Sequence, residues 1–112
     1  MPTARIRVVE YLDQLGRSPF ASWFEGLAAQ PAAKVSAALY RLGEGNFSNV
    51  EGVGGGVFER RIDSGPGYRI YFGKHGNAIV VLLGGSTKRR QQASIDAAKL
   101  RWAEYRSRAR ES

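Results

Sequence analysis

Three closely spaced segments in the second half of the chain have the pattern of β-strands, and they constrain the fold more than any other feature. Residues 57–62 and 68–72 alternate in side-chain character, and residues 78–83 are apolar throughout. The links at residues 63–67 and 74–77 contain glycine and other turn-forming residues. The sequence therefore predicts consecutive antiparallel hairpins, with residues 78–83 as a central strand covered on both faces.

The first half of the chain predicts one strand followed by two helices. Residues 5–9 alternate as a strand would, and Ser18-Pro19 is a helix start, with serine as the N-cap and proline at the first helical position. Apolar side chains at helical spacing follow in two runs, namely Phe20, Trp23, Phe24 and Leu27, then Val35, Leu39 and Leu42. We expect a helical hairpin lying on the sheet, followed by a glycine-rich loop over residues 43–56.

The chain ends in a predicted helix from about residue 90 to 106, which follows a turn at residues 84–87. Its apolar band consists of Ile95, Ala98, Trp102 and Tyr105. Residues 107–112 are predicted to be a frayed tail. The fold class expected is α+β, in one domain over residues 1–112, with a small antiparallel or mixed sheet of about four strands, an N-terminal helical hairpin and a C-terminal helix.

The net charge of +7 lies entirely in the second half of the chain. Residues 1–56 carry five Lys/Arg and five Asp/Glu, whereas residues 57–112 carry twelve and five. Such asymmetry favours a polyanion such as RNA or DNA, although anionic membranes and acidic proteins attract cations by the same force.

Composition excludes several kinds of chemistry. The absence of cysteine excludes disulfides, thiol catalysis and thiolate metal sites, and one histidine with scattered carboxylates gives no metal-ligand pattern, so no cofactor is expected. The N-terminus lacks a secretory signal, and the longest strongly apolar run is far shorter than the ~20 residues of a membrane-spanning helix. We expect a cytoplasmic protein.

The predicted hairpin places a candidate site on one face of the sheet. If its strands pair, alternation brings Arg61, Arg69 and Tyr71 together. Two guanidinium groups can bind the oxygens of one phosphodiester, and a phenol can transfer a proton or stack on a base. The alternative is a solvated cationic face in which Arg61 or Arg69 pairs with Glu59 or Asp63.

Further cations follow in both directions along the chain. Arg60 lies on the nominally apolar face, so either it extends past a sheet edge or a bulge shifts the register. Lys88, Arg89 and Arg90 follow the apolar strand and either extend the cationic surface or are merely solvated.

The second turn supplies Lys74 and His75 as candidate RNA-binding residues, although an exposed histidine without a role is the commoner case. A metal-free ribonuclease needs a base, an acid and cations for the pentavalent phosphate. This chain is rich in cations and poor in acid and base groups, so positioning would have to supply much of the rate.

Several segments spread over nearly the whole chain resemble one known family. They are Ala21-Ser22-Trp23-Phe24, Arg41-Leu42-Gly43-Glu44-Gly45-Asn46, Arg61-Ile62-Asp63, Gly65-Pro66-Gly67-Tyr68-Arg69-Ile70-Tyr71-Phe72, Leu82-Leu83-Gly84-Gly85 and residues 88–95. Together they resemble the HigB-like addiction-module killer proteins of the RelE/ParE toxin superfamily, which belong to bacterial type II toxin–antitoxin systems.

The resemblance implies a RelE-like fold and a ribosome-dependent mRNA endonuclease held silent by a cognate antitoxin, often a small helix-turn-helix protein. It also implies that Arg61, Arg69 and Lys88, together with Tyr71, contact the phosphate or the transition state. Two alternatives are a ParE-like inhibitor of DNA gyrase that acts by protein binding, and a nucleic-acid-binding module without catalysis. The chain departs from the family pattern at Arg60, where many relatives have an apolar residue.

Overall fold

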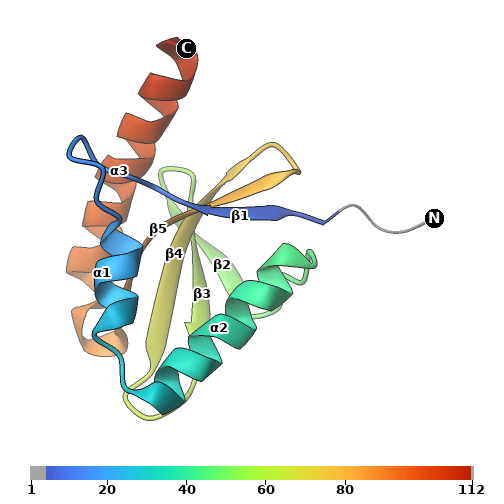
Figure 1. Ribbon diagram of the computed structural model, residues 1–112, viewed down its shortest axis with the longest axis vertical. Coiled ribbons are helices and arrows are strands. Elements are labelled where there is room, and N and C mark those ends of the chain that lie inside the picture. The colour runs from blue at the N-terminus through green and yellow to red at the C-terminus, as the bar shows by residue number, and fades with distance from the viewer. Residues whose placement is uncertain (1–4, 112) are drawn as a thin grey trace.

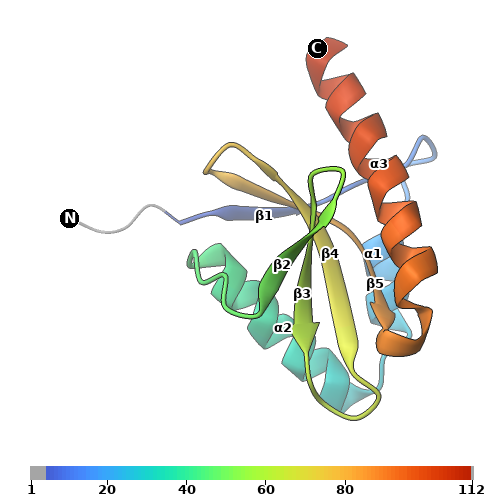
Figure 2. The same ribbon diagram turned by 180° about the vertical axis from the view of Figure 1, so that it is seen from behind.

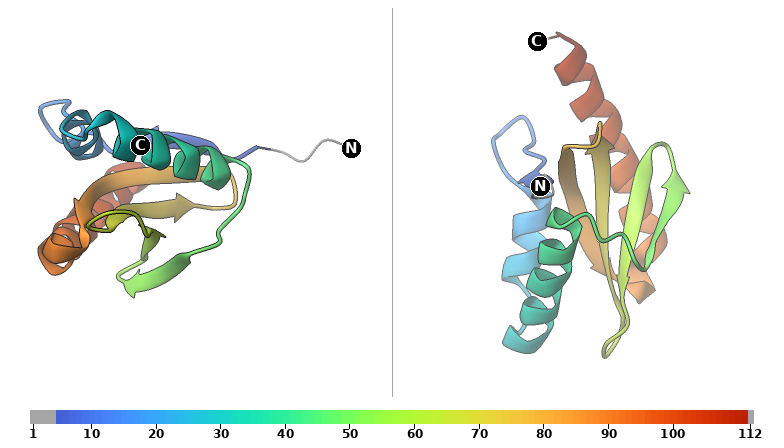
Figure 3. Two further views of the ribbon diagram at one scale, coloured as in Figure 1. Left: turned by 90° about the horizontal axis from the view of Figure 1, so that it is seen from below. Right: turned by 90° about the vertical axis from the view of Figure 1, so that its right-hand side faces the viewer.

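The computed structural model describes residues 5–111, and in this range a five-stranded mixed sheet lies between helices on both faces (Figures 1 and 3). The elements are β1 (Arg7–Glu10), α1 (Pro19–Glu25), α2 (Ala29–Gly43), β2 (Val50–Gly54), β3 (Val57–Ile62), β4 (Tyr68–His75), β5 (Ile79–Thr87) and, after a 3-10 turn at Lys88–Arg90, α3 (Gln91–Glu111). The strand order is β1-β5-β4-β3-β2, with β1 parallel to β5 and the other pairs antiparallel. The α+β class and the C-terminal helix are confirmed, but the sheet has five strands rather than about four.

The consecutive hairpins β3–β4 and β4–β5 are confirmed, with β5 lying between β4 and β1. One prediction within them is wrong, because residues 84–87 are the end of β5 and not a turn. Gly85 pairs with Ile70 in β4 and has no side chain because the Trp23 ring lies directly over it. A packing requirement, not a change of chain direction, therefore explains this glycine.

The predicted loop at residues 43–56 contains an edge strand that the sequence did not indicate. Strand β2 lies beside β3 (Figure 2) and pairs with it, with a register shift between Gly52 and Gly54. Two of its five residues are glycines and most of it is exposed, so no alternation of apolar side chains marks it. Edge strands with bulges are a common solution where a sheet must end.

The helix start at Ser18 is confirmed, since its hydroxyl accepts a hydrogen bond from the backbone N–H of Ala21 at 3.0 Å. The two N-terminal helices lie on the same face of the sheet, as predicted, but they diverge and so differ somewhat from the expected helical hairpin (Figures 1 and 2). Helix α1 packs against β5, whereas α2 packs against β1 and β3.

Two apolar cores lie on the two faces of the sheet. On the side of α1 and α2 the buried side chains are Phe20, Val35, Ala38, Leu42, Ile62, Ile70, Phe72, Val80 and Leu82. On the side of α3 they are Tyr11, Val57, Tyr71, Val81, Leu83, Ile95, Ala98 and Trp102. Each face also seats one tryptophan on a glycine, Trp23 on Gly85 and Trp102 on Gly73.

Helix α3 continues to Glu111 through most of the predicted tail, and Ser112 lies outside the described residues. Arg108 accounts for this length, because its Nη2 donates to the carbonyl of Leu12 at 2.7 Å and its guanidinium lies 5.3 Å from the centre of the Tyr11 ring. Within residues 5–111, the structure contains no helix that is both long and apolar enough to cross a membrane.

Candidate functional site

Arg61 and Arg69 are direct cross-strand partners, as the sequence predicted. The pairing of β3 with β4 sets Arg61 opposite Arg69 and Glu59 opposite Tyr71, so all four side chains leave the sheet on the α3 side. Their exposure differs, however. The Arg61 side chain is 40% exposed and pairs loosely with the exposed Glu51 at 3.8 Å, whereas the Arg69 side chain is only 6% exposed.

Arg69 lies between two carboxylates. Its Nε is 3.5 Å from Oε1 of the fully buried Glu59, an ion pair without hydrogen-bond geometry. Its Nη1 donates to the carbonyl of Tyr68 at 3.1 Å and is 4.0 Å from Oδ1 of Asp63, whose side chain is almost fully exposed. The guanidinium therefore spans from the interior, at Glu59, to the surface, at Asp63.

Tyr71 lies entirely inside the α3-side core. Its hydroxyl shares a 3.0 Å hydrogen bond with Oγ of Ser86, and none of the residue is exposed. Burial raises the pKa of the Tyr71 phenol above its ordinary value. The phenol is therefore out of reach of an RNA strand at the surface, and its hydrogen bond links β4 to β5.

Lys88 joins the two arginines at one end of the sheet. The turn between β3 and β4 meets the start of the 3-10 turn, where the N–H of Lys88 donates to the carbonyl of Gly67 at 3.1 Å. A Cβ placed on Gly67 would lie 3.4 Å from Cβ of Lys88 and 3.7 Å from Nη1 of Arg69. We call Arg61, Arg69 and Lys88 the basic edge.

Arg89 and Arg90 extend the positive surface around the end of β5 towards α1. With Arg101, they line a pocket of about 450 Å³ beside Pro19 and Gly85. Arg101 donates from Nη1 to the carbonyl of Leu83 at 2.9 Å, and burial lowers its pKa. These cations adjoin the basic edge but face α1.

Lys74 and His75 lie at the opposite end of β4 and are not part of the basic edge. His75 lies six positions beyond Arg69 along the strand, which corresponds to about 20 Å. The ammonium of Lys74 lies over the rings of Phe47 and Phe58, 4.7 Å from each centre, and Nδ1 of His75 is 3.2 Å from the hydroxyl of Tyr105.

The sequence analysis allowed for a pair between Arg69 and Glu59 on a solvated face, but it missed Gln91, which holds Glu59 at the start of α3. Glu59 was considered only as a surface counter-charge, yet it is fully buried and accepts a 2.6 Å hydrogen bond from Nε2 of Gln91. The alternation of Glu59 in step with Arg61 and Arg69 was the available signal.

Among residues 5–111, no three histidine, aspartate or glutamate side chains are placed to hold a metal ion.

Comparison with known proteins places the chain among relatives. No protein-family model matches it. An uncharacterized protein of Haemophilus influenzae is 43% identical over 82 residues, which are 72% of this chain and 83% of that protein. The chain belongs to the same family as this Haemophilus protein. A match of this length in a 112-residue chain necessarily spans β3 and β4, so the family relationship covers the strands that carry Arg61 and Arg69.

Proposed function

We propose that this protein is the RNA-cleaving toxin of a type II toxin–antitoxin system and cuts mRNA on the ribosome. The observation that carries the proposal is the basic edge, in which Arg61 and Arg69 face each other across two strands and Lys88 adjoins Arg69 through Gly67. The resemblance of the segments around these residues to the RelE/ParE toxins also supports the proposal. We propose further that the α+β fold is of the RelE-like form.

The basic edge suits the transition state of RNA cleavage. Attack of the 2′-hydroxyl on phosphorus forms a pentavalent phosphate with added negative charge, which guanidinium and ammonium groups stabilise. Its collapse breaks the bond to the 5′-oxygen, which leaves with a proton from solvent. Arg61 reaches solvent, and the outer end of Arg69 donates from Nη1 to the carbonyl of Tyr68 and lies 4.0 Å from the exposed Asp63 carboxylate. Such exposed pairs contribute little stability, so a phosphate could replace the Asp63 carboxylate at small cost.

Asp63 is a residue beside the basic edge that could accept a proton. A phosphate that displaces Asp63 from Arg69 leaves its carboxylate beside the attacking group, as a candidate acceptor for the 2′-hydroxyl proton. Most of the rate would then come from charge stabilisation and from a ribosome that holds the strand in line for attack.

The test is induction of wild type, Arg61→Gln and Lys88→Gln in bacterial cells, with mapping of mRNA 5′ ends. Both variants are expected to reduce growth arrest and cleavage, because each removes one cation from the basic edge. Arg7→Gln on the edge strand β1 is the control and should remain as toxic as wild type. Growth arrest with intact transcripts would refute the proposal.

A cognate antitoxin is the expected partner, and its acidic groups would cover the basic edge. Twelve of the seventeen basic residues lie in the second half of the chain, so association should weaken as salt is added. Binding that is indifferent to ionic strength would contradict this part of the proposal.

The burial of Tyr71 favours a second candidate, a basic module that binds nucleic acid without cutting it. Tyr71 is inside the core and His75 is at the far end of β4, so neither supplies an acid or base at the basic edge. RNA binding with steep salt dependence and no toxicity would support this module. Arrest with DNA damage and intact mRNA would instead support a gyrase inhibitor.

A further inference from the structure

Arg60 lies on the face of the sheet opposite the basic edge. β3 pairs with β4 in unbroken register through Arg60 and Ile70, so no bulge between them turns the side chain away from α2. Only 6% of the residue is exposed. Its Nη1 donates to the carbonyl of Arg61, and its Nε is buried with no hydrogen-bond partner among the residues that the structure describes.

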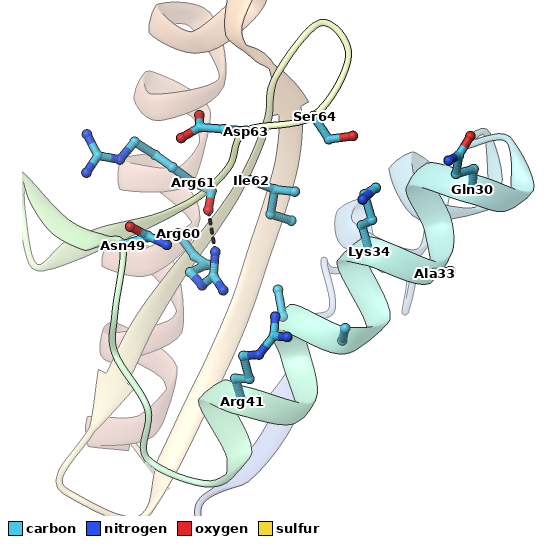
Figure 4. A pocket seen from close by; sticks show the side chains of 12 residues that line it. Gln30, Ala33, Lys34, Arg41, Asn49, Arg60, Arg61, Ile62, Asp63 and Ser64 are labelled. Carbon is cyan, nitrogen blue, oxygen red and sulfur yellow. Dashed lines mark hydrogen bonds between the residues drawn. The ribbon is translucent and has the colours of Figure 1, made fainter.

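The Arg60 side chain faces a pocket of about 660 Å³ between α2 and β3 (Figure 4). Arg41 extends from α2 towards Arg60, and Lys34 projects from the preceding turns of the same helix. Small apolar side chains form much of the remaining wall, namely Ala33, Ala37, Ala38 and Ile62. We call this space the α2 pocket.

Positive charge in the α2 pocket is not compensated. The acidic residue in its lining is Asp63, which pairs with Arg69 instead. Over residues 5–111, neither Arg60, Arg41 nor Lys34 forms an ion pair with a carboxylate. Burial and the charge of Arg41 both lower the pKa of Arg60. A buried cation without a counter-charge is costly, and an anion in the pocket would relieve that cost.

We propose that the α2 pocket binds a phosphate group, with Arg60 as its buried anchor and Arg41 and Lys34 as the flanking charges. Arginine presents a planar fork of donors that matches phosphate oxygens, and Nη2 of Arg60 donates no hydrogen bond among residues 5–111. A phosphomonoester carries a charge of about −1.5 to −2 near pH 7. Three cations therefore match a phosphomonoester better than they match a single carboxylate. None of the described residues that line the pocket is aromatic, so the phosphate rather than a base is recognised.

The three proposed phosphate ligands lie on the other face of the sheet from Glu59 and Arg69, although Arg61 and Asp63 also line the pocket. Because Arg60, Arg41 and Lys34 are not part of the basic edge, their substitution tests this site separately from RNA cleavage. Its ligand is either a free phosphomonoester or the terminal phosphate of an RNA strand. A short oligoribonucleotide with a 5′-phosphate, compared with the same strand bearing a 5′-hydroxyl, separates these sources. Preference for the phosphorylated strand over inorganic phosphate identifies RNA, whereas equal affinity identifies a free phosphate.

The experiment measures the melting temperature and calorimetric affinity of the purified full chain with inorganic phosphate against chloride at equal ionic strength. We expect phosphate to raise the melting temperature of wild type, as any ligand of the folded state does. Arg60→Met should abolish the rise, and Arg41→Gln should weaken binding about tenfold or more. Arg7→Gln, an exposed cation on β1, should behave as wild type.

Arg41→Gln also protects the test against misfolding, because Arg41 is exposed whereas Arg60 is in the interior. Three outcomes would overturn the proposal. They are an equal effect of phosphate and chloride on wild type, a phosphate effect that Arg60→Met and Arg41→Gln both retain, and an acetate effect as large as that of phosphate.

Discussion

Glu59 and Arg69 form an ion pair beneath the start of α3, with Oε1 of the carboxylate 3.5 Å from Nε of the guanidinium. The pair is joined to α3 through the hydrogen bond from Gln91 to Glu59. Arg61, directly opposite Arg69, has no comparable anchor and reaches solvent. Arg69 is therefore a buried part of the fold, whereas Arg61 is accessible at the surface.

Removal of either arginine should therefore have different effects on stability. Arg69→Ala leaves the buried Glu59 carboxylate without a cation and is expected to lower the free energy of unfolding by about 3–5 kcal/mol. Arg61→Ala breaks only an exposed pair and should cost less than about 1 kcal/mol. Urea denaturation of both variants measures the difference, and equal losses would show that Glu59 does not depend on Arg69.

The hydrogen bond between Tyr71 and Ser86 should be structural. Tyr71→Phe leaves the Ser86 hydroxyl buried without this partner and should cost about 1–3 kcal/mol. Adding Ser86→Ala to Tyr71→Phe should recover part of the loss, which a double-mutant cycle in urea measures. RNA cleavage by the folded Tyr71→Phe protein should match wild type; a loss of cleavage without a loss of stability would give the phenol a catalytic role.

Both glycine–tryptophan contacts should be intolerant of a methyl group. A Cβ on Gly73 would overlap the ring of Trp102, and one on Gly85 would overlap the ring of Trp23. Gly73→Ala and Gly85→Ala should each cost about 1–3 kcal/mol through overpacking. Gly52→Ala in β2 is the matched control, because its Cβ would meet Phe58 at an ordinary 3.9 Å. Thermal unfolding of the three variants distinguishes overpacking from a general effect of alanine in strands.

The Glu104 carboxylate should make stability depend on acid. Hydrogen bonds from Arg108 and Tyr11 lower the pKa of Glu104 below its ordinary value of 4.5. Its contribution is therefore complete above pH 4.5 and is lost as the pH falls through the lower pKa of the folded protein. Wild type should melt above Glu104→Gln at pH 7, and the gap should narrow as the pH falls below 4.5. Glu10→Gln, an exposed site on β1, is the control, and a gap independent of pH would contradict the assignment.

Local signals were sufficient for much of the fold. The Ser18 cap, the two hairpins and the apolar band of α3 each depend on side chains within one segment, so the pattern alone predicts them. Strand β2 escaped prediction because its pairing with β3 depends on the partner strand rather than on its own side chains.

The sequence predicted which residues of the candidate site lie side by side, but not which of them are buried. Alternation along β3 and β4 correctly placed Arg61 beside Arg69. It could not show that α3 covers Tyr71 and Glu59, because a polar side chain facing a helix has the same spacing as one facing water. The charge of the α2 pocket was hidden for a similar reason, since Arg41 and Arg60 meet only through the packing of α2 on β3.

The chain has two tryptophans, and the sheet separates them, with Trp23 on the side of α1 and Trp102 on the side of α3. Replacing one indole at a time by phenylalanine would give two variants, each with a single tryptophan in one layer. Emission from the remaining ring would then report whether the two layers melt together or in sequence, without any added dye.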